Sequence, residues 1–134
     1  LNTSLYNMTI LLLFLIFVAL EFFESTWQKS DTLYGLINNN FSIFNKNIIL
    51  YFLLHTTFFY TIFLSFYLNN FTFWMSSILV IKFLDISFKL TLMQKLSSGK
   101  EINELIPMNI NMNLVFRYMN LVIYPLTFLF AIGF

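Results

Sequence analysis

The sequence predicts an all-α integral membrane protein, a single domain over residues 1–134 that forms a bundle of four transmembrane helices in two hairpins. The first observation is composition: the chain is 59% hydrophobic and 10% charged, whereas about 25% of the residues of a soluble domain are charged. The second is that apolar residues fall into four long stretches. The third is that the charged residues gather toward one end of those stretches.

The four stretches have the length that a membrane requires, since roughly 20 helical residues cross about 30 Å of hydrocarbon. We place the spans at about 5–25, 47–68, 71–93 and 113–133. The Asn69-Asn70 pair between the second and third spans leaves room only for a tight turn. These two spans are therefore expected to form an antiparallel hairpin.

The two longer connections are expected to carry short interfacial helices. In the first, Ser30 or Asp31 could cap a turn or two of helix that would end at the asparagine run 38–40. In the second, Ser98 and Glu101 have the spacing of a capping box. A short helix over about 99–106 would follow and would stop at Pro107.

Charge distribution predicts the orientation of the bundle. All seven cations and six anions lie in the connections 26–46 and 96–112 or in the halves of the spans that adjoin them. The chain ends and the Asn69-Asn70 turn carry no charged side chain. By the positive-inside rule, the two connections face the cytoplasm or organelle matrix, and both termini face the outer side.

Ionisable side chains inside the spans are the candidate functional residues. A charge at that depth costs a few kcal/mol unless it is paired, hydrated or able to reach the interface. Lys82, Asp85 and Lys89 share one face of the third span. The tight turn at Asn69-Asn70 places His55 level with Asp85. The predicted intramembrane polar network consists of Glu21, His55, Lys82, Asp85, Lys89 and Arg117.

Two interpretations of this network stay open. One is a proton or ion relay through Glu21, His55, Lys82 and Asp85. The other is a set of ion pairs that holds the helices together or contacts another subunit. The second is favoured because the outer half of the bundle offers only hydroxyl, amide and tyrosine side chains, and a path needs polar groups across the full thickness. The sequence also shows no clear small-x-x-x-small pattern, so close helix approach is not expected.

Several chemistries are not expected. The chain has no cysteine and only one histidine, so it offers no thiolate site and no second histidine for a bis-histidine haem. It has no Gly-rich phosphate loop and no His-Glu-x-x-His motif. A net charge of +1 does not favour nucleic acid. We therefore expect no enzyme activity, no metal and no cofactor.

Residue usage suggests the source. Phe, Tyr, Ile, Asn and Lys, which have AT-rich codons, greatly outnumber Gly, Ala, Arg and Pro. No basic residue precedes Lys29, so an Arg-rich mitochondrial transit peptide is not recognised. The expected function is a non-catalytic subunit of a larger complex in the mitochondrial or bacterial inner membrane, of respiratory-chain type if organellar, with lipids and other membrane subunits as partners. The alternative is a small transporter or proton-path component using His55, Lys82 and Asp85.

Overall fold

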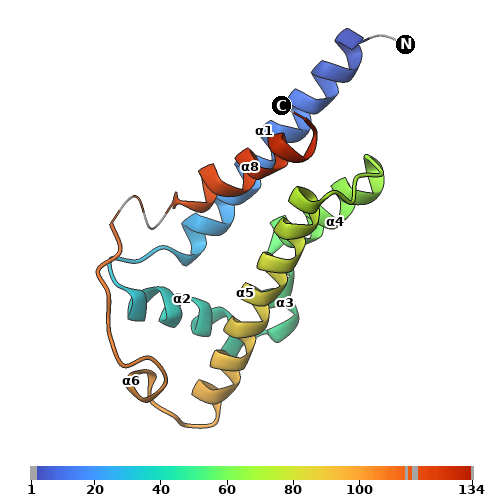
Figure 1. Ribbon diagram of the computed structural model, residues 1–134. Coiled ribbons are helices and arrows are strands. Elements are labelled where there is room, and N and C mark those ends of the chain that lie inside the picture. Colours follow the sequence, from blue (N-terminus) through green and yellow to red (C-terminus); the bar gives the residue numbers. More distant parts are fainter. Residues whose placement is uncertain (1–2, 114, 116–117, 134) are drawn as a thin grey trace.

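The computed structural model in Figure 1 is all-α, which confirms the predicted class. It describes residues 3–113, 115 and 118–133. Within these residues there are seven helices, and the one β-type contact is an isolated bridge between Thr32 and Asn111. The helices are α1 (Thr3–Gln28), α2 (Leu33–Lys46), α3 (Ile48–Leu53), α4 (Thr56–Tyr67), α5 (Phe73–Ser97), α6 (Ile102–Leu105) and α8 (Asn120–Ala131).

One helix of the described residues, not four, is long and apolar enough to cross a membrane by itself, and this corrects the sequence prediction. That helix is α1. Helix α5 has 25 residues but carries Lys82, Asp85 and Lys89 in its middle. Helix α8 has 12 residues, fewer than the roughly 20 that a membrane requires. The four predicted spans thus differ in length, charge and continuity.

The predicted second span, 47–68, is two helices rather than one. Helix α3 ends with Leu54 as its C-cap, and α4 begins with His55 as its N-cap at φ −81° and ψ 63°. Asn47 starts α3 because its side-chain oxygen accepts hydrogen bonds from the amides of Ile49 and Leu50. Residues 54 and 55 are leucine and histidine, so no glycine or proline marks the break.

The first connection holds a longer helix than predicted. Thr32 caps α2, not Ser30 or Asp31, since its hydroxyl oxygen accepts from the amide of Gly35. The helix then continues through the asparagine run to Lys46. Asn40, in this run, is buried and hydrogen-bonded at both ends of its side-chain amide. Its nitrogen donates to the Leu36 carbonyl, and its oxygen accepts from the Tyr51 hydroxyl.

The second connection corrects the predicted capping box. Ser98 is the C-cap of α5, and its hydroxyl donates to the Lys95 carbonyl. Glu101 is the N-cap of α6 without a side-chain hydrogen bond. The short helix exists, but it is a single turn that ends at Ile106, immediately before Pro107.

The two ends of the molecule are formed by different segments of the chain. Figure 1 shows α1 running beside α8 and α4 running beside α5, with α2 and α6 gathered at the lower end. The start of α1, the end of α8 and the turn between α4 and α5 lie toward the other end. In that turn Asn69 adopts a φ of 48°, a conformation that asparagine tolerates better than most residues. A tight helical hairpin of α4 and α5 is therefore present at the predicted turn, whereas its membrane-spanning character stays a prediction.

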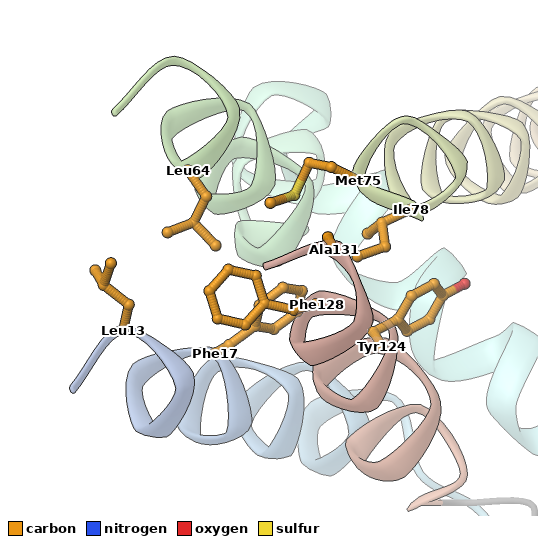
Figure 2. Packing of buried hydrophobic residues seen from close by; sticks show 8 residues of the cluster. All are labelled: Leu13, Phe17, Leu64, Met75, Ile78, Tyr124, Phe128 and Ala131. Carbon is orange, nitrogen blue, oxygen red and sulfur yellow. The ribbon is translucent and has the colours of Figure 1, made fainter. Parts of the chain in front are cut away.

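Two apolar clusters form the core. The first joins α1, α4, α5 and α8 in the half of the bundle nearer the α4–α5 turn, and Figure 2 shows Phe17 and Phe128 at its centre. The second joins α2, α3 and α5 at the end that holds α2. The members of the first cluster are Leu13, Phe17, Leu64, Met75, Ile78, Tyr124, Phe128 and Ala131. Between the two clusters the interior is polar.

Candidate functional site

A buried ion pair lies at the centre of this polar layer. Nζ of Lys82, on α5, is 2.5 Å from Oε1 of Glu21, on α1. The Glu21 side chain is fully buried and that of Lys82 nearly so. Both residues occur in the predicted network, and the structure brings them together across two helices.

Lys82 also contacts a third helix. Its Nζ lies 3.8 Å from the centre of the Tyr124 ring on α8, a distance at which a cation is attracted to the face of an aromatic ring. Tyr124 is itself a buried member of the first apolar cluster, and Figure 2 shows its hydroxyl directed away from the cluster centre. One ammonium group thus joins α1, α5 and α8.

The break between α3 and α4 is stabilised by side chains from α1. Oε1 of Glu24 accepts a hydrogen bond of 2.7 Å from the backbone amide of Thr57 in the first turn of α4. A carboxylate in this position satisfies a free helix amide and interacts favourably with the helix dipole. Nε1 of Trp27 lies 3.4 Å from the carbonyl oxygen of Leu54, the last residue before the break. Backbone groups that a continuous helix would satisfy internally are therefore satisfied by α1.

His55 lies at the break and not on a regular helix face. Its Nδ1 lies 3.0 Å from the Tyr51 carbonyl oxygen, and its ring packs edge-on against Tyr51 and Trp27. His55 and Asp85 line the same small cavity, while their predicted common depth in a membrane stays a prediction. No hydrogen bond or ion pair joins them among the described residues.

The small cavity beside the ion pair has a volume of about 10 Å³, close to that of one water-sized sphere. Its lining includes Glu24, His55, Thr57, Lys82 and Asp85. Within the described part of the chain, two of these buried side chains have an atom without a hydrogen-bond partner: Nε2 of His55 and Oγ1 of Thr57. The layer is therefore polar, and part of its hydrogen-bonding capacity is unused.

Asp85 and Lys89 lie nearer the surface of the bundle than Glu21 and Lys82 do. Asp85 Oδ2 is 3.0 Å from Lys89 Nζ, and the Asp85 side chain is 48% exposed. Lys89 also donates a 2.7 Å hydrogen bond to Oε1 of Gln28 on α1. The deep charges of this protein are Glu21 and Lys82, while Asp85 forms an ordinary pair one turn apart on its own helix. Arg117 lies outside the described residues.

A column of hydroxyl groups was missed at the sequence level. Thr57, Thr61 and Ser65 are all buried on one face of α4. The hydroxyls of Thr61 and Ser65 donate to the carbonyl oxygens four residues earlier, so these buried hydroxyls are hydrogen-bonded within their own helix. Their four-residue spacing is a small-x-x-x-small pattern, which the sequence analysis did not recognise as one, and α4 does pack against α1.

Comparisons with known proteins give no relative. No protein-family model, no curated protein and no solved structure matches this chain. Within the described residues, no group of three His, Cys, Asp or Glu side chains is placed to hold a metal ion. What the site can do is therefore argued from its own geometry, which is that of a buried electrostatic connection among four helices.

Proposed function

We propose that this chain is a non-catalytic integral membrane subunit of a larger membrane protein complex. The observation that carries the proposal is the buried polar layer, in which Glu21, Glu24 and Lys82 join four helices while large apolar side chains cover the outside. Charged groups inside and apolar groups outside suit a chain surrounded by lipid and apolar protein. A network made of mutual ion pairs and helix caps serves to hold helices in register.

The proposal keeps four passages through the membrane, of unequal construction. They are α1, the broken pair α3 and α4, α5, and a last passage that ends with α8. A broken helix is tolerated at membrane depth where its free backbone groups are buried in protein, and Glu24 and Trp27 meet that requirement here. The exposed apolar faces of α1 and α8 would contact lipid or neighbouring subunits.

The outer half of the bundle argues against a proton or ion path. Phe17, Leu64, Met75 and Phe128 are all fully buried there, and Figure 2 shows them packed between four helices. A continuous path would need polar or hydrated groups in place of this cluster. The arrangement therefore favours a structural role for the Glu21–Lys82 pair.

We propose that the protein lies in the inner membrane of a mitochondrion or a bacterium, because its amino-acid usage favours residues that have AT-rich codons. The polar connections would face the matrix or cytoplasm, with both ends of the chain on the outer side. In support, α2 and α6 lie at one end of the molecule and the α4–α5 turn at the other. A complex of the respiratory-chain type is the organellar version of this proposal.

Extraction of the native particle tests the proposal. The tagged chain, solubilised in a mild detergent, should migrate on a native gel far above its own 16.0 kDa and should hold a fixed ratio to several different chains through two further purification steps. A particle that contains only copies of this chain would contradict the proposal.

The alternative is a small transporter, and the broken helix favours it. Discontinuous helices often mark ion sites at the membrane midplane, and here the break adjoins the ion pair and the column Thr57, Thr61 and Ser65. The double substitution Glu21→Gln with Lys82→Met distinguishes the two functions. A structural pair predicts normal assembly and unchanged ion flux, whereas a relay predicts normal assembly with abolished flux.

A further inference from the structure

A second cavity opens between α2 and α5, apart from the buried ion pair. Its volume is about 380 Å³, within the range of roughly 300–1,000 Å³ that small-molecule sites occupy. Most of its wall is apolar. The apolar lining residues include Leu33, Leu36, Ile37, Leu92, Met93 and Ile106. The cavity is therefore suited to a molecule with a substantial apolar part.

The polar wall of this cavity is formed by side chains of α1, α2 and α5, and two of them retain hydrogen-bonding capacity. Among the described residues, Lys89 has two partners, Gln28 at 2.7 Å and Asp85 at 3.0 Å. A lysine ammonium has three donors, so one is left for a ligand. The half-exposed Asp85 carboxylate likewise has acceptor positions beyond the one that faces Lys89. Asn40, by contrast, is engaged with Gln28, Leu36 and Tyr51.

The charges of this polar wall cancel. Lys89 contributes one positive charge and Asp85 one negative charge, and they lie 3.0 Å apart. An anionic head group would approach Asp85 unfavourably, and a cationic one would approach Lys89 unfavourably. A neutral head that both donates and accepts a hydrogen bond meets no such repulsion.

We infer that this cavity binds a neutral amphiphile with a hydroxyl head group and an apolar chain. The head group accepts a hydrogen bond from Lys89 and donates one to Asp85. The apolar chain lies against Leu36, Leu92 and Ile106. This site does not depend on whether the chain is a subunit or a transporter, because it is built within one copy of the chain.

Photolabelling of the purified full chain tests the inference. The probe is monodecanoylglycerol carrying a diazirine on its acyl chain, and the protein is held in amphipol so that little detergent competes. We expect labelled residues within 33–37 and 88–93, and loss of that labelling when excess unlabelled monodecanoylglycerol is added. Labelling spread over the exposed face of α1 and insensitive to competition would overturn the inference.

Variants and a charged probe test the two parts of the site separately. Lys89→Met should lower labelling about tenfold, the effect of losing one hydrogen bond to a charged group. Leu36→Trp should also lower it by filling the apolar part, whereas Leu126→Trp on the exposed face of α8 is the matched control and should not. Decanoyl lysophosphatidic acid with the same diazirine should label the cavity much less. Equal labelling by both probes would refute selection of a neutral head.

Discussion

The buried face of α1 changes character halfway along the helix. Its first half is apolar and packs into the cluster of Figure 2, while its second half is polar and meets the ion pair and the helix break. The buried residues are Ile10, Leu13 and Phe17 up to about the middle of the helix and Glu21, Glu24, Ser25 and Gln28 beyond it. One helix therefore contacts its neighbours by two different kinds of interaction.

The difference shows how such a bundle obtains specificity. In lipid, apolar side chains gain little from leaving the solvent, because lipid tails are as apolar as leucine, so apolar contacts depend on shape. A buried charge, in contrast, needs one particular partner. The polar half of α1 contacts α5 through the ion pair with Lys82 and contacts α4 through the hydrogen bond from the Thr57 amide. The apolar half fills the space between these helices.

The largest expected effect is the loss of one member of the ion pair. Lys82→Met should destabilise the fold by about 3–5 kcal/mol, because it leaves the Glu21 carboxylate buried without its partner. Unfolding by a denaturing detergent, followed by circular dichroism, measures this change. Adding Glu21→Gln should recover most of the loss, and a double variant as unstable as the single one would show that Lys82 acts through Tyr124 instead.

The next effect concerns the apolar half. Phe17→Ala should cost about 3 kcal/mol, since it removes a fully buried ring that packs against Tyr60 and Phe128. Phe23→Ala, on the same helix but 43% exposed, is the matched control and should change stability little. The same detergent unfolding measures both. Equal losses would mean that the Phe23 face is also packed, against a partner.

The overall class and the hairpin could be predicted because they depend on local features. Hydropathy, helical periodicity and the Asn69-Asn70 turn act over short stretches of sequence, and all-α folding follows from them. The interruption at Leu54 and His55 could not be found in this way. It depends on Glu24 and Trp27, about thirty residues away in the chain, and no local residue announces it.

The sequence predicted which residues form the polar network better than how deeply each is buried in the bundle. Glu21 and Lys82, both predicted members, form a buried ion pair, whereas Asp85 pairs with Lys89 and its side chain is 48% exposed. Glu24 was treated as the end of a span, although it follows Glu21 by three residues and shares its face. Reading α1 as one buried face, from Ile10 to Gln28, would have revealed the change from apolar to polar residues.

A smaller effect is expected at the cap of α4. Glu24→Gln keeps an oxygen that can accept from the Thr57 amide but removes the charge, which should cost about 1 kcal/mol. Amide hydrogen exchange by NMR should show faster exchange at Thr57, with little change in α8. Glu104→Gln, at an exposed site in α6, is the control. Unchanged exchange at Thr57 would indicate that another group caps this helix.

The smallest effect is expected at Asp85, and it provides the sharpest test of the comparison between buried and peripheral charge. Asp85→Asn removes an exposed pair one turn apart on α5, which is typically worth about 0.3–0.5 kcal/mol. Lys89 keeps its hydrogen bond to Gln28, so no cation is left alone. Detergent unfolding should therefore barely distinguish Asp85→Asn from the unaltered protein, in contrast to Lys82→Met on the same helix. A loss above about 2 kcal/mol, a size that requires a desolvated charge, would mean that Asp85 is covered by a neighbouring subunit in the assembled complex.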